Sequence, residues 1–156
     1  MTEKNTRDLI DEETTRSLME VLMNTDNVDK YLKDNKDSLN PYMTFIEYYQ
    51  SLPKVKSMKL SEIKNASNIN KNYFYPLIRG TKNSPNRDYV IALCIAAKLD
   101  IEETQKGLKI AKLGELYSRD SRDAIIIFCI NHNKTVIETD EMLEERGEEI
   151  ISKYKD

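Results

Sequence analysis

The feature that most constrains the fold of this chain is a four-residue pattern that occurs three times, in which Thr or Asp is followed three residues later by Glu. It reads TFIE from Thr44, DIEE from Asp100 and TVIE from Thr135, each time at the start of a segment with apolar residues at helical spacing. In such a capping box the two side chains accept hydrogen bonds from each other's backbone N–H groups, so that a helix begins there. Only four glycines and four prolines interrupt the 156 residues. The sequence therefore predicts an all-α fold.

Apolar periodicity predicts the remaining helices. Two short helices are expected at 14–24 and 26–39, before Pro41, and two more at 60–67 and 70–79. The segment 87–99 is apolar almost all round, which is typical of a helix at the centre of a core. The run AIIIFCI (124–130) fits a buried strand or a helix; we assign a helix because the sequence offers no partner strand.

Local features indicate where several helices begin and end. Pro53, Gly80 and Gly114 are expected to end helices, and the tail 148–156 is expected to form a short one. The stretch SRDSRD (118–123) is interpreted as a helix cap with local ion pairs.

The charges are distributed unevenly along the chain. The net charge is −3, but residues 54–89 carry eight basic and two acidic side chains, a net charge of +6. The flanks are acidic: residues 1–42 carry −4, residues 43–53 carry −1 and residues 90–156 carry −4. A basic block in an otherwise acidic protein is either a solvated face or the electrostatic footprint of a nucleic-acid site.

Several functional classes are disfavoured by the sequence. No stretch of eighteen apolar residues could span a membrane, and the charged start MTEKNTRDLIDEE does not resemble a secretory signal. The two cysteines, Cys94 and Cys129, lie in apolar runs, as expected for buried, reduced thiols of a cytoplasmic protein. With one histidine they cannot build a zinc site from nitrogen and sulfur ligands alone. Cys129 and His132 could share a helix face, but nothing in the sequence orients the histidine, so we expect neither an enzyme nor a cofactor.

The order of elements from Thr44 to Leu99 resembles the five-helix domain of the Xre/Cro (lambda-repressor-like) helix-turn-helix family. The helix YVIALCIAAKL fits the apolar helix that follows the motif in this family, and further compatible positions are Met58, Glu62, Ile63, Ile69, Asn70, Phe74, Leu77, Gly80 and Pro85. The chain departs from the family pattern at four places. Lys59 replaces a capping Thr, Leu60 replaces a Gln that contacts phosphate, Asn68 replaces the turn Gly, and Pro76 has no counterpart. Asn68 tolerates the left-handed conformation that the turn requires, and Asn70 is a favourable N-cap.

The resemblance implies three regions: an N-terminal helical extension (1–42), a helix-turn-helix DNA-binding domain (43–100) and a C-terminal helical region (101–156). It implies a bacterial, cytoplasmic regulator of transcription that binds double-stranded DNA without a cofactor. Carried over position by position, its DNA contacts fall on Lys71, Asn72, Tyr73, Tyr75, Arg79, Lys82 and Arg87. Pro76 would lie inside the recognition helix, where it removes a hydrogen bond to the Asn72 carbonyl. We therefore expect this helix to kink or to begin one turn late.

Two alternatives remain open from the sequence. The helix-turn-helix scaffold could instead be an adaptor that binds a partner protein, with the tyrosines as anchors. Residues 101–156 could form a homodimer interface or pack back on their own chain, because they carry apolar residues outside the DNA-binding pattern, among them Ile126, Ile127, Val136, Leu143, Ile150 and Ile151.

Overall fold

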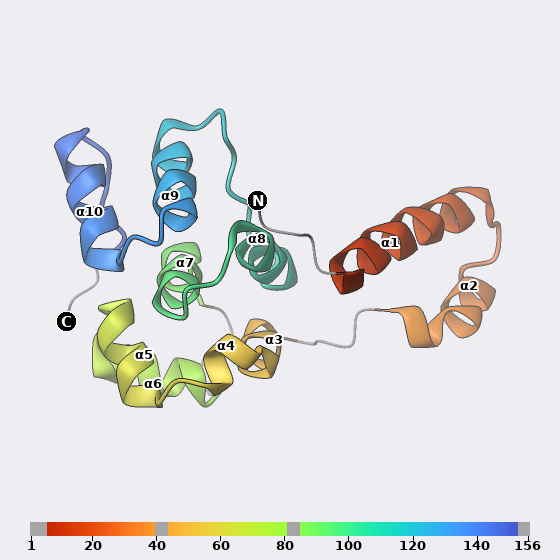
Figure 1. The fold of residues 1–156 in the computed structure, drawn as a ribbon. Coiled ribbons are helices and arrows are strands. Elements are labelled where there is room, and N and C mark those ends of the chain that lie inside the picture. Colours follow the sequence, from red (N-terminus) through yellow and green to blue (C-terminus); the bar gives the residue numbers. More distant parts are fainter. Residues whose placement is uncertain (1–5, 40–43, 81–84, 153–156) are drawn as a thin grey trace. The chain divides into compact units, whose positions relative to one another are not determined.

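The structure, a computed structural model, describes residues 6–39, 44–80 and 85–152, with the backbone only for residues 6–13. These residues form ten α-helices and one 3-10 helix without any strand, which confirms the all-α prediction (Figure 1). The chain divides into two compact units, Met1–Pro41 and Tyr42–Asp156. No helix in the described ranges has both the length and the apolar composition that a membrane span requires.

The first unit contains α1 (Thr6–Asn24), α2 (Val28–Asp34) and the 3-10 helix η1 (Lys36–Ser38). Two helices were predicted here, but α1 begins eight residues earlier than its predicted start at 14. The second predicted helix is interrupted after Asp34, where Asn35 separates α2 from η1. Asn27 begins α2, because its side chain accepts a hydrogen bond from the Lys30 N–H at 3.0 Å.

The second unit begins with five helices: α3 (Phe45–Ser51), α4 (Pro53–Lys56), α5 (Leu60–Ser67), α6 (Lys71–Ile78) and α7 (Arg87–Ala96). The Thr44 hydroxyl accepts a hydrogen bond from the Glu47 N–H at 3.2 Å, so α3 begins where the capping pattern predicted. Pro53 was expected only to end this helix. It also begins α4 as the first helical residue, where the missing N–H leaves no hydrogen bond unmade.

Three more helices follow: α8 (Ile101–Ile110), α9 (Ser121–Asn131) and α10 (Val136–Glu145). Both reciprocal hydrogen bonds of the capping box are present at the start of α8 and again at the start of α10, as predicted. The run 124–130 is helical, within α9.

Two predicted ends in this half of the unit are wrong. Gly114 does not end α8. The helix stops at Ile110, and Lys112 takes the left-handed conformation (φ 59°) while the Leu113 N–H bonds to the Leu108 carbonyl. The predicted C-terminal helix is absent from the described tail, where the Asp140 carboxylate instead accepts from the Ile151 N–H at 2.6 Å. Residues 153–156 lie outside the described residues.

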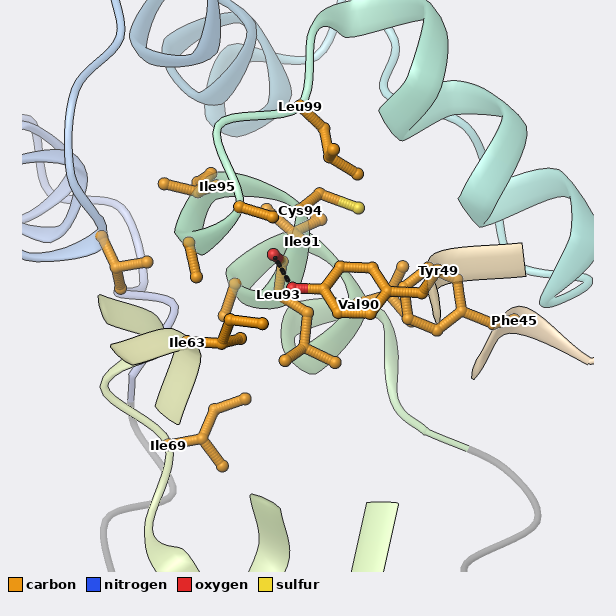
Figure 2. Close-up of a cluster of buried hydrophobic side chains, with 14 of the residues drawn as sticks. Phe45, Tyr49, Ile63, Ile69, Val90, Ile91, Leu93, Cys94, Ile95 and Leu99 are labelled. Atoms are coloured by element: carbon orange, nitrogen blue, oxygen red, sulfur yellow. Dashed lines mark hydrogen bonds between the residues drawn. The ribbon is translucent and has the colours of Figure 1, made fainter. Parts of the chain in front are cut away.

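Helix α7 is the centre of the second unit. Eight of its ten residues are buried, and α5, α8 and α10 pack against it. Figure 2 shows its apolar side chains among those of neighbouring helices, with the Tyr49 hydroxyl donating a hydrogen bond to the Leu93 carbonyl at 2.7 Å. That bond satisfies the one polar atom of a tyrosine side chain that is otherwise packed among apolar groups. Neighbouring helices therefore cover the near-continuous apolar surface predicted for this segment on several sides.

The C-terminal helices belong to the same core. Ile126, Val136, Leu143 and Ile151 are all at most 1% exposed and lie in one hydrophobic cluster with α7. They are four of the six apolar residues for which the sequence left open a homodimer interface at 101–156. Packing within the chain accounts for them, so this region needs no second copy to bury these side chains.

Two crossed ion pairs join the first turns of α7 and α9. The Arg87 guanidinium forms two hydrogen bonds of 2.9 and 2.8 Å with the Asp123 carboxylate, and Arg122 bonds to Asp88 at 3.0 Å. The local ion pairs expected within residues 118–123 are therefore wrong for Arg122 and Asp123, whose partners lie more than thirty positions earlier in the chain. Asp120 does cap α9, because it accepts a hydrogen bond from the Asp123 N–H.

The first testable consequence concerns Asp123. Burial acts to raise the pKa of this carboxyl, but hydrogen bonds from Arg87 and from the Tyr117 N–H outweigh burial and hold its pKa below the ordinary value. We expect Asp123→Asn to lower the free energy of unfolding at pH 7 by about 2 kcal/mol, less than for a fully buried pair because Arg87 keeps some contact with water.

The sign of the pH dependence follows from that lowered pKa. The contribution of the ion pair is fully present above the unfolded-state pKa of about 3.9 and is lost as the pH falls through the lower folded-state pKa. Urea denaturation between pH 7 and pH 2.5 measures this, with the exposed Asp26→Asn as control. A difference between Asp123→Asn and wild type that stays constant down to pH 2.5 would contradict the assignment.

Candidate nucleic-acid interface

The connection between α5 and α6 is a tight turn held by side chains. Asn68 has a left-handed backbone (φ 57°), and the Asn70 side chain accepts a hydrogen bond from the Asn72 N–H at 2.8 Å, as predicted for both residues. The Ser67 hydroxyl donates to the Lys64 carbonyl and accepts from the Ile69 N–H. The direction in which α6 leaves the turn is therefore determined by short-range hydrogen bonds.

Helix α6 buries one face and exposes its first residues. Phe74, Leu77 and Ile78 are buried in the core, and the Gln50 side chain ties the Ile78 carbonyl to α3 at 3.1 Å. Gly80 follows the helix with φ 76°, and its N–H bonds to the Leu77 carbonyl, which confirms the predicted helix end. The exposed residues of α6 therefore lie at the start of the helix.

Lys71 and Asn72 occupy that free start and are both exposed. They are the first two residues of α6, where the backbone N–H groups and the helix dipole already favour an anion. Of the seven predicted DNA contacts, Lys71, Asn72 and Arg79 are exposed among the described residues.

Tyr73 and Tyr75 are less available, because each is half-buried and packed within the chain. The Tyr73 ring lies 5.8 Å from that of Tyr89 on α7, and the Tyr75 ring meets Phe74 edge-on at 5.1 Å. The exposed Arg79 places its guanidinium 5.7 Å from the Tyr75 ring centre, in a cation–π contact. The tyrosines thus brace α6 and position Arg79.

The last two predicted contacts stand apart from this group. Arg87 is committed to Asp123 and also donates to the carbonyls of Gly114 and Glu115, so its role in the structure is to hold the loop before α9. Lys82 lies outside the described residues.

Positive charge is concentrated around α6. We call Lys56, Lys59, Lys64, Lys71 and Arg79, which lie between α4 and the residue that follows α6, the basic segment. Within the described ranges none of them forms an ion pair. Lys54, in contrast, is paired with Glu103 on α8 at 2.6 Å. Lys64 also lines a shallow open depression of about 260 Å³ at the turn, together with Asn65, Asn68, Ile69 and Asn70.

The Cys129 and His132 side chains are not brought together as a dyad. Cys129 is buried with its Sγ 3.5 Å from the Met142 Sδ, whereas the exposed His132 ring stacks on Phe128 and donates from Nδ1 to the Phe128 carbonyl. Burial raises the pKa of the Cys129 thiol, which disfavours the nucleophilic thiolate. No group of three or more His, Cys, Asp or Glu side chains in the described part of the chain is arranged to hold a metal ion.

Comparison of the chain with protein-family models, with curated proteins and with solved structures finds no match. The resemblance to the Xre/Cro family therefore remains a hypothesis that rests on the residues themselves.

Pro76 does not delay the start of α6. The helix begins at Lys71 and continues to Ile78 with the proline inside it, so of the two predicted outcomes, a kink or a late start, the late start is wrong. Burial of Leu77 and Ile78 and the Arg79 N–H bond to the Tyr75 carbonyl hold the last turn despite the missing N–H.

We expect Pro76→Ala to leave the free energy of unfolding unchanged or to raise it by up to about 2 kcal/mol. It restores the bond to the Asn72 carbonyl, which is partly offset by the greater freedom of the unfolded chain. Pro53→Ala is the matched control and should lower stability by about 0.5–1 kcal/mol, because this proline is favourable at the first position of α4. Thermal and urea denaturation measure both. A loss of more than about 1 kcal/mol in Pro76→Ala would mean that packing of the ring outweighs the missing hydrogen bond.

Proposed function

We propose that this protein is a sequence-specific regulator of transcription that presents the start of α6 to the major groove of double-stranded DNA. The observation that carries the proposal is the exposure of Lys71 and Asn72 at the first turn of a short helix that follows a rigid turn. The major groove, about 12 Å wide, admits one α-helix, and helix-turn-helix proteins read it with the N-terminal residues of the second helix.

The chemistry of these side chains suits base recognition. An asparagine amide can accept from and donate to the same adenine edge, and a lysine ammonium can donate to guanine or to phosphate. Asn72 keeps its side chain for such a contact, because the hydrogen bond that caps the helix uses its backbone N–H and the side chain of Asn70. In this proposal the Asn72 side chain contacts a base, while the Asn70 side chain caps the helix.

The basic segment supports the backbone part of binding. Phosphate contacts supply most of the affinity of a DNA-binding protein and position it along the duplex, whereas base contacts select the sequence. Arg79 is suited to a phosphate because it is exposed, carries no ion pair within the described residues and is steered by the Tyr75 ring. Arg87, which is held by Asp123, is left out of the proposed contacts.

The experiment is a binding titration against genomic DNA fragments, including the region upstream of the protein's own coding sequence, at several salt concentrations. The logarithm of affinity should fall with the logarithm of salt concentration, at a slope of about −0.9 for each phosphate neutralised. Arg79→Ala should flatten that slope by about one unit on every fragment. Arg119→Ala, an exposed arginine in the loop before α9, is the matched control and should leave it unchanged.

Asn72→Ala should behave differently from Arg79→Ala. We expect it to keep the salt slope and to cost about 1–3 kcal/mol of binding free energy on the preferred fragment only. Asn131→Ala, an exposed asparagine at the end of α9, serves as its control. If the wild type shows no salt-dependent binding to any fragment, the regulator proposal fails and the adaptor function becomes the better explanation of the scaffold.

A further inference from the structure

The first unit exposes an unusual share of the apolar side chains of this chain. Eleven large hydrophobic residues are exposed among the described residues, and seven of them lie between positions 19 and 39, where α1 ends and α2 follows. These seven, which we call the hairpin patch, are Met19, Val21, Leu22, Met23, Val28, Leu32 and Leu39. Met23, at 76% exposure, is the most exposed of the eleven.

Few packing contacts stabilise the helices that carry the hairpin patch. None of the residues of α2 is buried, and α2 is only seven residues long. Helices shorter than about 12–15 residues are marginal in water, and most helical stability in proteins comes from packing an apolar face. Contact between α1 and α2 supplies some packing, but it leaves the hairpin patch uncovered. A partner surface that covers the hairpin patch would therefore stabilise α2.

Five of the seven residues of the hairpin patch are arranged in stripes. Met19, Leu22 and Met23 are spaced i, i+3 and i+4 and share one face of α1, while Val28 and Leu32 are four apart on α2. Two helices with such stripes, joined by a short turn, form half of a four-helix bundle.

We propose that the other half is the same hairpin of a second copy of this chain, so that the first unit is a homodimerisation module. A specific protein interface buries about 800 Å² on each partner, an area that the exposed residues of the hairpin patch and the polar side chains around them can supply. A two-fold interface of this kind uses the same patch on both subunits.

The charges around the hairpin patch fit self-association better than a strongly charged partner. Residues 14–39 carry four basic and five acidic side chains, so two copies meet with little net repulsion. Helix α2 carries two charges of each sign, at Asp29, Lys30, Lys33 and Asp34. Such a near-neutral surface has no excess charge with which to select an acidic or basic partner.

The dimer is independent of the proposed DNA binding, because it uses none of the residues of the basic segment. It also differs from the dimer that the sequence suggested for residues 101–156, where the apolar side chains at four of six positions are already buried.

The test is the molar mass of the full chain in solution, measured by light scattering after size exclusion and by sedimentation at 1–100 µM. The wild type should have twice the chain mass of 18.2 kDa at the upper concentrations. Met19→Lys combined with Met23→Lys should raise the dimer dissociation constant at least tenfold, because it buries charge in the interface while lysine near the end of α1 keeps the helix favourable. Ile137→Lys is the matched control, since Ile137 on α10 is as exposed as Met19, at 57%.

Hydrogen exchange of α1 gives a second readout that does not depend on the variants. In the wild type its protection should increase with protein concentration, while that of α7 should not change. A wild type that is monomeric at 100 µM overturns the proposal. Protection of α1 in that monomer would indicate that the hairpin patch is covered by other residues of the same chain. A double lysine variant that dimerises as well as the wild type overturns it as well.

Discussion

The second unit is organised around helix α7, which is apolar on most of its sides. Helix α7 buries eight of ten residues, so helices must cover it from several directions, and α5, α8 and α10 do so. The Tyr49 hydroxyl, bonded to the Leu93 carbonyl, allows an aromatic ring to fill the space beside this helix without leaving a polar atom unsatisfied. The exposed start of α6 depends on this arrangement, because Phe74, Leu77 and Ile78 anchor that helix in the same cluster.

The crossed ion pairs show that an arginine of the basic block can stabilise the fold and need not be available to a ligand. Arg79 and Arg87 are both arginines of the basic block of the sequence, yet only Arg87 finds a carboxylate within the described residues. Arg87 also gathers the Gly114 and Glu115 carbonyls, which places the loop before α9. Breaking a partly buried pair of this kind leaves a charge without its partner, so Arg87 contributes to stability independently of any ligand.

Local chemistry made much of the fold predictable, and long-range contacts account for most of what was missed. The starts of α3, α8 and α10, the left-handed Asn68 and the cap at Asn70 depend on residues within four positions, so the sequence predicted them. The use of Lys112 rather than Gly114 to end α8 was missed because a lysine is an unusual left-handed residue. The Arg87–Asp123 pair spans 36 positions, which no local pattern reveals. At the candidate site, Lys71 and Asn72 are exposed and the two tyrosines are half-buried, a difference that depends on tertiary contacts such as that of Tyr73 with Tyr89 on α7.

The burial of Ile151 has a consequence for the order of events during synthesis. This side chain is 1% exposed in the cluster that also contains Phe45, and the Asp140 carboxylate holds its backbone in place. A nascent chain that has emerged only as far as α8 therefore lacks part of its core, although it already carries the candidate DNA-reading helix. Because domains fold as units, the second unit completes its folding only after residue 151 has left the ribosome. The presentation of α6 therefore depends on a buried side chain more than seventy positions later in the chain.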